Sequence, residues 1–283
     1  MGTLLHLADR DVRRVLTPSL ASSAVESAFR QHATGDAIGP EMFSLHAAEG
    51  GFHAKGGGLT LGRRYVAVKV NANFPRNPAR HGLPTIQGLV LLFDGERGTP
   101  LAVLESGELT ALRTAAATVV AARHLAREDA RVVVVVGCGI QGRAHVQALD
   151  RALRCRRIHL VDVVPGRAEA LAAELGATAS AALLPSTTLA AVLAEADVCV
   201  TCTTAERPFL RRADVRPGTF IAAVGADSER KQELEPELVA SATVVPDLRL
   251  QAEAIGELRG AIAAGLLRSY SWRAELGEIV AGR

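Results

Sequence analysis

The stretch from Arg131 to Asp162 constrains the fold of this 283-residue chain more than any other part of the sequence. It begins with five consecutive valines, an apolar run that is typical of a strand buried on both faces. The sequence GCGIQG, residues 137–142, follows directly and has G-x-G-x-x-G spacing. A helix-like segment, residues 143–153, and a second apolar segment, residues 158–161, come next. Strand, glycine turn, helix and strand in this order predict a βαβ unit that binds a dinucleotide.

The glycine turn and the acid that follows it supply the groups that such a cofactor needs. The first glycine allows the tight turn, the second lets backbone amides approach a pyrophosphate, and the third lets the helix pack close to the strand. The N-terminal amides of the helix face the negative charge. Asp162 lies twenty residues after Gly142, where a carboxylate can accept hydrogen bonds from the adenosine ribose. The expected cofactor contacts of the turn are Gly137, Gly139, Ile140, Gln141 and Gly142.

Alternation of strands and helices continues after Asp162 and predicts the fold class. Helix-like segments cover residues 167–175, 186–196 and 249–267, and strand-like segments cover residues 198–203, 219–224 and 243–245. This alternation indicates an α/β protein with a parallel, doubly wound Rossmann sheet. Ligands of such sheets bind beyond the carboxyl ends of the strands. We therefore expect Thr203, Val224 and Asp227 at the same rim as the glycine turn.

The first part of the chain has a different pattern, which predicts an α+β domain. Helices are expected over residues 8–16 and 19–31. Short extended segments punctuated by glycine follow, at residues 42–46, 51–55, 65–70, 86–93 and 101–105. These segments indicate a mainly antiparallel sheet. A helix rich in alanine is expected over residues 114–125.

Two lysines of this part lie in strand-like segments that could line a pocket. Lys69 alternates with valines in VAVKVNANF, so it shares a face with Ala67 and Asn71. That face is small and polar, which fits either a solvated surface or the wall of a pocket. Lys55 is followed by three glycines in GFHAKGGG, which indicates that the backbone approaches another group closely.

Three further residues are candidates for chemistry. Arg113 and Thr114 are expected to end a loop at the start of the alanine-rich helix. The guanidinium there could bind a carboxylate and Thr114 could hold a phosphate, although a capping threonine beside a solvated arginine fits equally well. Asp227 follows a strand of the Rossmann sheet and could act as a general acid or base near a nicotinamide. It could also cap a helical turn over residues 228–234.

Composition excludes several classes of protein. The formal net charge is +2, with acids and bases interspersed, which predicts neither a nucleic-acid surface nor a membrane surface. The four cysteines lack the spacing of a disulfide framework, and Cys199 and Cys202 lie in a strand-like segment, so core thiols in a reducing cytoplasm are expected. No apolar run is long enough to span a bilayer, and the first residues lack the pattern of a signal peptide. The eight histidines show no metal-ligand spacing, so no metal is expected.

Four runs of the sequence together resemble the ornithine cyclodeaminase/mu-crystallin family. They are residues 74–94 (FPRNPARHGLPTIQGLVLLFD), 110–127 (TALRTAAATVVAARHLAR), 135–149 (VVGCGIQGRAHVQAL) and 222–238 (AAVGADSERKQELEPEL). The resemblance implies a substrate-binding and dimerisation domain of residues 1–113, to which residues from about 265 to 283 return. It also implies an NAD-binding Rossmann domain of residues 114–264 and a homodimer. Family members continue past residues 276–283 (LGEIVAGR), so this chain is expected to be shorter than its relatives at that end.

The resemblance also implies roles for individual residues. Lys69 matches the active-site lysine of the family, Arg113 its carboxylate-binding arginine and Asp227 its acid/base aspartate. The arginine that many members carry in an early strand is replaced here by residues 40–43 (PEMF), and Lys55 is expected to supply its charge. Asp162 matches the acid of members that prefer NAD. Because Val163 and Val164 follow it, a 2′-phosphate would meet a negative charge without a basic partner, which favours NAD(H) over NADP(H).

Hydride transfer at an α-carbon that bears nitrogen and a carboxylate is the chemistry that the resemblance implies. We expect an amino-acid dehydrogenase or a ketimine or cyclic-imine reductase, because the FHAK and KQEL segments look more like that branch of the family. One alternative is an ornithine- or lysine-type cyclodeaminase, in which NAD is catalytic and ammonia is released. A second is a non-catalytic NAD(P)H-binding protein of the crystallin type.

Overall fold

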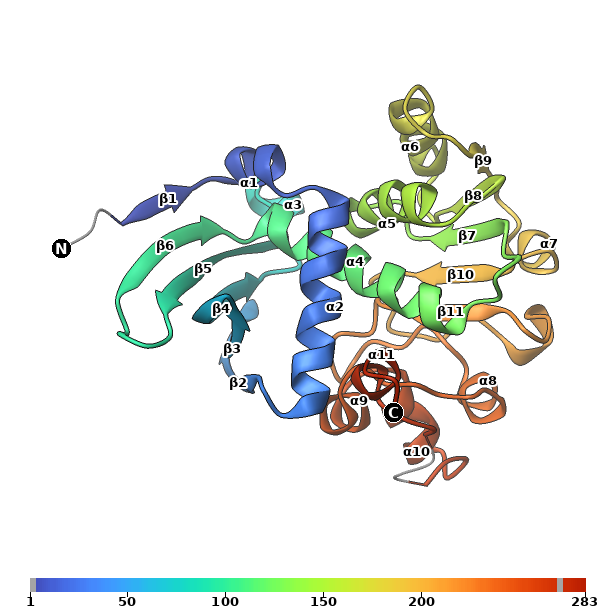
Figure 1. Cartoon of the computed structure of the whole chain (residues 1–283). Helices are drawn as coiled ribbons and strands as arrows, with labels where there is room; N and C mark the ends of the chain where they lie inside the picture. Colours follow the sequence, from blue (N-terminus) through green and yellow to red (C-terminus); the bar gives the residue numbers. More distant parts are fainter. Residues whose placement is uncertain (1–3, 269–271) are drawn as a thin grey trace. The chain divides into compact units, whose positions relative to one another are not determined.

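The computed structural model describes residues 4–268 and 272–283 of the chain (Figure 1). The chain divides into two compact units, residues 1–113 and 114–283, and each unit contains its own sheet. This mixed α/β architecture confirms the predicted fold class. The division places residues 265–283 in the second unit, whereas the sequence predicted that they return to the first. Residues 1–3 and 269–271 of the predicted ranges lie outside the described residues.

The first unit is built on a six-stranded sheet with the order β1-β6-β5-β4-β3-β2. Its elements are β1 (Leu5–Leu7), α1 (Asp9–Val15), α2 (Pro18–Thr34), β2 (Ile38–Ala47), β3 (Gly50–Leu61), β4 (Arg63–Asn73), α3 (Asn77–His81), β5 (Ile86–Asp94) and β6 (Pro100–Glu105). Strands β2 to β6 pair antiparallel, as predicted, and β1 joins β6 in parallel. Helix α2 begins where the Thr17 hydroxyl accepts a hydrogen bond from Leu20 N, and it ends at Gly35 with φ 81°.

The register of the antiparallel strands sorts their side chains onto two faces. Lys55 pairs directly with Lys69, and Lys69 pairs with Val90, so these three side chains share one face. The opposite face carries large apolar side chains that are exposed. This apolar sheet face consists of Phe43, Leu45, Phe52, Val70, Leu89 and Leu91.

The three glycines after Lys55 lie inside β3, and their close neighbours are strands of the same sheet. A Cβ at Gly58 would lie 2.8 Å from Tyr65 O in β4, and a Cβ at Gly57 would lie 3.1 Å from Ile38 O in β2. The close approach that the sequence indicated is therefore satisfied by neighbouring backbone of the sheet.

The second unit contains a five-stranded sheet with the order β11-β10-β7-β8-β9, and every pair in it is parallel. Its elements are α4 (Gly107–Leu125, which begins in the first unit), β7 (Val132–Val136), α5 (Ile140–Ala152), β8 (Arg157–Val161), α6 (Arg167–Leu175), β9 (Ala182–Pro185), α7 (Leu189–Leu193), β10 (Val198–Thr201), β11 (Phe220–Ala223), α8 (Pro236–Ser241), α9 (Arg249–Ala254), α10 (Glu257–Ala263) and α11 (Leu276–Val280). The order reverses between β7 and β10, as in a doubly wound dinucleotide-binding sheet. All five valines of β7 are buried, as the apolar run predicted.

Three local predictions for this unit are wrong. Residues 243–245 do not form a strand, and the helix expected over residues 249–267 is broken into α9 and α10 at Gly256, whose φ is 95°. Residues 228–234 form turns and an isolated bridge rather than a helical turn, so Asp227 does not cap a helix. The short strand β9 was not predicted.

Helix α4 begins seven residues earlier than the sequence predicted. Arg113 and Thr114 therefore lie inside the helix rather than at its start. The first turn is capped by Asp9 of α1, whose Oδ1 accepts a hydrogen bond of 2.9 Å from Glu108 N. A Cβ at Gly107 would lie 2.5 Å from Asp9 Oδ2, so glycine is needed where this carboxylate approaches. The N-terminal amides that were expected to hold a phosphate here are used by a side chain of the protein.

Candidate cofactor and substrate sites

Each glycine of the loop after β7 is required for a different reason. Gly137 has φ +101°, and a Cβ there would lie 2.8 Å from Cys202 O. A Cβ at Gly142 would lie 1.9 Å from Gly137 O, so any side chain would force helix α5 away from its strand. At Gly139, which precedes the first residue of α5, an added Cβ meets no atom within 4 Å. The exposed space beside a helix N-terminus fits a phosphate group, so the loop has the geometry of a dinucleotide site.

Asp162 braces this loop from the end of β8. Its Oδ2 accepts a hydrogen bond of 2.8 Å from Cys138 N, and its Oδ1 accepts one of 2.8 Å from Val164 N. The carboxylate is 6% exposed, and Arg167 Nη1, at the start of α6, lies 3.9 Å from its Oδ1. The sequence reasoning considered only the two residues after Asp162 and missed this arginine. Asp162 therefore has a basic neighbour, although none lies directly after it in the sequence.

The predicted residues at the rim of the sheet are held by hydrogen bonds at the ends of β10 and β11. Val224 N donates to Thr201 O at 2.8 Å, which continues the pairing of the two strands. The Thr203 hydroxyl donates to Glu233 Oε1 at 2.7 Å and accepts from Ala205 N at 3.1 Å. The hydroxyl therefore acts as a donor and as an acceptor within the protein itself. The side chain of Thr203 fixes the shape of its loop.

Asp227 lies in the loop after β11 and is accessible. Its side chain is 54% exposed, and Lys231 Nζ donates to its Oδ1 at 2.7 Å. Asp227 N donates to Gly225 O at 3.0 Å, so the aspartate follows a tight turn of backbone. A carboxylate that is accessible and hydrogen-bonded to an ammonium group can accept or release a proton.

Glu233 is a residue of this unit that the sequence reasoning missed. It is completely buried, and its carboxylate accepts hydrogen bonds from Thr203 and from Gly225 N. The only feature of the sequence that points to Glu233 is its place in the KQEL segment. A glutamate is rarely buried unless its carboxylate has partners.

Three cationic side chains of the first unit act on one another. Burial, which removes hydration from the charged form, and the positive charges of Arg113 and Lys55 together lower the pKa of Lys69 from 10.5 to about 8. The sequence identified all three residues, but the direct pairing of Lys55 with Lys69 follows only from the register of β3 and β4. A cluster of cations in which one lysine is partly buried favours binding of a carboxylate.

The polar wall of this face extends beyond the lysines. Asn71, two residues after Lys69 on the same face, accepts a hydrogen bond of 2.7 Å at Oδ1 from the Ser106 hydroxyl. A Cβ at Gly88 would lie 2.3 Å from Asn71 Oδ1, so glycine makes room for the amide. The small polar face that the sequence left open between surface and pocket is thus a fixed hydrogen-bonded arrangement.

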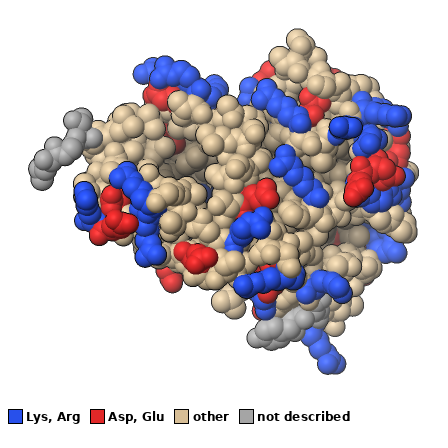
Figure 2. All heavy atoms as spheres, in the orientation of Figure 1, with Lys and Arg blue, Asp and Glu red and all other residues tan. Residues whose placement is uncertain are grey.

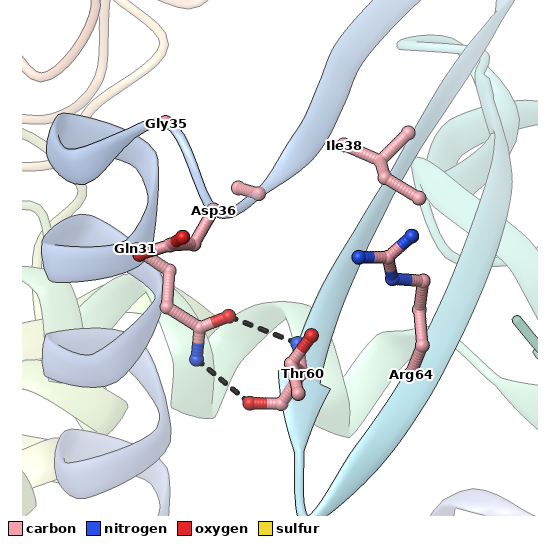
Figure 3. Close-up of a pocket in the computed structure, with 7 residues that line it drawn as sticks. Gln31, Gly35, Asp36, Ile38, Thr60 and Arg64 are labelled. Atoms are coloured by element: carbon pink, nitrogen blue, oxygen red, sulfur yellow. Dashed lines mark hydrogen bonds between the residues drawn. The ribbon is translucent and has the colours of Figure 1, made fainter.

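A separate hollow of about 520 Å³ lies between the C-terminal end of α2 and the hairpin of β3 and β4 (Figure 3). Gln31 closes one side of it, because its amide donates to Thr60 O and accepts from Thr60 N, both at 2.9 Å. Its lining residues are Gln31, Gly35, Asp36, Ala37, Ile38, Thr60 and Arg64, none of which is a predicted site residue.

The cysteines have the character of core thiols. Cys138, Cys155, Cys199 and Cys202 are free, and burial raises the pKa of each thiol, to about 12 for Cys199. A thiol that stays protonated is a poor nucleophile and a poor metal ligand. Among the described residues, no cluster of three His, Cys, Asp or Glu side chains could hold a metal ion.

Basic and acidic groups are interspersed on the face of the molecule drawn in Figure 2.

A family model matches residues 5–283 of the chain, and its description is the ornithine cyclodeaminase/mu-crystallin family. The chain belongs to this family. The resemblance found in four separate runs of the sequence is confirmed over nearly the whole length. None of the helices within residues 4–268 and 272–283 is long and apolar enough to cross a membrane.

Similar proteins in the ornithine cyclodeaminase/mu-crystallin family include dehydrogenases and reductases of amino or imino acids as well as cyclodeaminases. The iminosuccinate reductase of Paracoccus denitrificans is 36% identical over 291 residues, which cover 99% of this chain and 86% of that protein. An archaeal alanine dehydrogenase dimer with bound NAD has a TM-score of 0.92 and 32% identity, covering 99% of this chain and 85% of that one. The Δ1-pyrroline-2-carboxylate reductase of Thermococcus litoralis, in complex with NADH and L-proline, has a TM-score of 0.93 and 27% identity, covering 99% and 87%.

Proposed function

We propose that this chain is an NAD(H)-dependent oxidoreductase that interconverts a small α-imino carboxylate and the corresponding α-amino carboxylate by hydride transfer at the α-carbon. One observation carries the proposal. A partly buried lysine, Lys69, lies in the field of two further cations, on a unit distinct from the one that has the dinucleotide loop. A carboxylate is the ligand that such a cluster favours, and a dinucleotide loop supplies the redox partner.

Three residues of the first unit bind and activate the substrate in this proposal. Arg113 and Lys55 hold the carboxylate, and this pairing removes much of the entropic cost of alignment. Lys69, as an ammonium group, donates to the imine nitrogen or to the carboxylate and makes the α-carbon more electrophilic. In the direction of oxidation the neutral amine of Lys69 can instead activate water, and a pKa of about 8 makes both forms accessible near neutral pH.

Asp227 moves the proton in this proposal. Reduction of the C=N bond consumes one hydride and one proton, and oxidation releases both. NADH supplies the hydride when it is bound. Asp227 exchanges the proton with the substrate nitrogen or with water, and the hydrogen bond from Lys231 holds its carboxylate in place.

The cofactor in this proposal is NAD(H), held by Gly137, Gly139, Ile140, Gln141 and Gly142, with contributions from Asp162, Thr114, Thr203 and Val224. The carboxylate of Asp162 would repel a 2′-phosphate, and this repulsion favours NAD(H) over NADP(H). Arg167 reduces this repulsion but does not abolish it. Its guanidinium lies 3.9 Å from the Asp162 carboxylate, so the two charges only partly neutralise one another.

The test measures NADH oxidation with pyruvate plus ammonia, with oxaloacetate plus ammonia and with a cyclic imino acid. Release of ammonia from ornithine with catalytic NAD is measured in parallel. We expect stoichiometric NADH oxidation with at least one imine, and Asp227→Asn should abolish it while NADH still quenches or shifts fluorescence on binding. Ammonia release from ornithine without net change in NADH would instead establish the cyclodeaminase reaction. NADH binding without turnover of any of these substrates would leave the crystallin-type alternative.

We also propose that the protein works as a homodimer in the cytoplasm. The apolar sheet face exposes six large apolar side chains, which is more than an isolated soluble unit normally leaves in water. Burial of this face against a second copy would remove that cost. The four free thiols fit a reducing compartment.

A further inference from the structure

Glu233 closes the loop that carries Asp227. Strand β11 leads into Gly225, the loop continues through Asp227 and Lys231, and it ends at Glu233, where Gly225 N donates to Glu233 Oε2 at 2.9 Å. Asp227 N is itself bonded to Gly225 O at 3.0 Å. The aspartate therefore stands two residues from an anchor that a buried carboxylate holds in place.

The same carboxylate holds the loop after β10. Glu233 Oε1 accepts hydrogen bonds of 2.7 Å from both Thr203 N and Thr203 Oγ1. One side chain thus receives three donors from the carboxyl ends of two adjacent parallel strands. These three hydrogen bonds tie the two loops to one side chain.

The surroundings of Glu233 leave it no freedom to move. A Cβ at Gly225 would lie 2.4 to 2.6 Å from the carboxylate atoms of Glu233, and the φ of Gly225 is not in the left-handed region. Glycine is therefore needed here to admit the carboxylate rather than to permit a backbone conformation. The backbone of Glu233 is also fixed, because its N donates to Glu257 Oε1 at 2.8 Å and its O accepts from Phe209 N and Leu210 N.

We propose that Glu233 is a positioning residue for the proton-transfer step, which sets the place of Asp227 relative to the Thr203 loop without touching substrate or cofactor. The inference rests on the proposed function of Asp227. The half-buried carboxylate of Glu257 supports the backbone of this segment, since it accepts from Glu233 N and from Leu234 N.

The test compares Glu233→Gln with a matched control at the opposite end of the same sheet. In Glu233→Gln an amide NH₂ replaces one of the two acceptor oxygens. It faces a backbone N–H or the Thr203 hydroxyl, so the hydrogen bonds to the end of one strand are lost. Asp197 precedes β10 and is also a buried carboxylate, which accepts from Arg131 N at 2.8 Å and Val132 N at 2.9 Å and pairs with Arg127 and Arg216. Asp197→Asn therefore disturbs a similar polar network far along the strands from the rim.

We expect kcat of Glu233→Gln to fall by about ten- to a hundredfold, because a misplacement of roughly 1 Å has effects of that size. The pH profile of its kcat should also change, and the KM for NADH should change much less. Asp197→Asn should lower thermal stability and leave kcat and the pH profile as in the wild type. Equal kcat values for the two variants, measured below their unfolding temperatures, would overturn the proposal.

Amide hydrogen exchange gives a second readout that does not need a known substrate. Exchange of residues 225–231 should accelerate in Glu233→Gln by about tenfold or more and stay unchanged in Asp197→Asn. Should Glu233→Gln fail to fold, Thr203→Val removes one of the three donors while the charge remains, and it should show the same effects at smaller size. An unaltered loop in these variants refutes the positioning role. Absence of turnover in the wild type with every imine would refute the proposed function instead.

Discussion

Replacement of Lys55 by methionine tests whether the three cations of the first unit act as one site. Lys55 is the smallest of three causes that together lower the pKa of Lys69 from 10.5 to about 8, after burial and the charge of Arg113. Its removal should therefore raise the pKa of Lys69, and by less than removal of Arg113 would.

The sign of the effect follows from the active form of Lys69. Imine reduction needs the ammonium form, so the reductive kcat/KM should fall as the pH rises through about 8 in the wild type. When Lys55 no longer opposes the charge, the ammonium persists to higher pH, and the falling limb should move to higher pH. The substrate KM should also rise by roughly ten- to a hundredfold, because a hydrogen bond to a charged group contributes about 1.5–3 kcal/mol.

The assay is the pH dependence of kcat/KM for imine reduction, with NADH saturating, in the wild type, Lys55→Met and Lys55→Arg. Lys55→Arg keeps the positive charge beside Lys69, so its limb should coincide with that of the wild type even if its KM differs. A limb that stays in place or moves to lower pH in Lys55→Met would refute the reasoning. Equal displacement in both variants would show that packing rather than charge moved it.

Three further pairs of variants test the cofactor site and the assembly. Gly139→Ala should keep the wild-type melting temperature, because its Cβ meets no atom within 4 Å, but it should weaken NADH binding. Gly142→Ala should lose about 1–3 kcal/mol of stability or more, because its Cβ would overpack against Gly137 O. Wild-type NADH affinity in Gly139→Ala, measured by fluorescence titration, would contradict the phosphate role of this loop. Asp162→Ala should weaken NADH binding more than NADPH binding, whereas Arg167→Ala should weaken mainly NADPH; equal losses for both cofactors in Asp162→Ala would remove the basis of the preference. Phe43→Glu, on the apolar sheet face, should convert a dimer to a monomer in light scattering, while Leu250→Glu, at a leucine of α9 that is 86% exposed, should leave the mass unchanged.

The parts of the fold that were predictable from the sequence are those determined by local pattern. The valine run, the glycine turn and the strand after it lie within 32 residues, and each signal depends only on its neighbours in the chain. The antiparallel sheet of the first unit was predictable in kind, because glycine-punctuated extended segments seldom form anything else. Its register was not, since the pairing of Lys55 with Lys69 depends on the whole β3–β4 hairpin.

The predictions that failed depended on groups distant in sequence. Gly107 looked like a loop residue because glycine disfavours helices, but Asp9 caps the helix there from 99 residues before Glu108. Arg167 approaches Asp162 only because α6 begins beside the end of β8. Glu233 has the local sequence of a surface glutamate, because the groups that donate to its carboxylate lie up to 30 residues away in the chain. A local pattern cannot reveal a partner that the tertiary fold supplies.

The cap at the start of α4 has a consequence for the order in which the first unit is assembled. Asp9 is bonded twice near this point, through its carboxylate to Glu108 N and through its own N–H to Glu105 Oε2 at 2.8 Å. Both bonds close loops of nearly a hundred residues, and such long loops form late on a folding pathway because of their entropic cost. The first turn of the helix that carries Arg113 is therefore completed only when the beginning of the chain returns to it. Arg113, for which we propose carboxylate binding, therefore lies on a helix whose first turn depends on a residue 99 positions before Glu108.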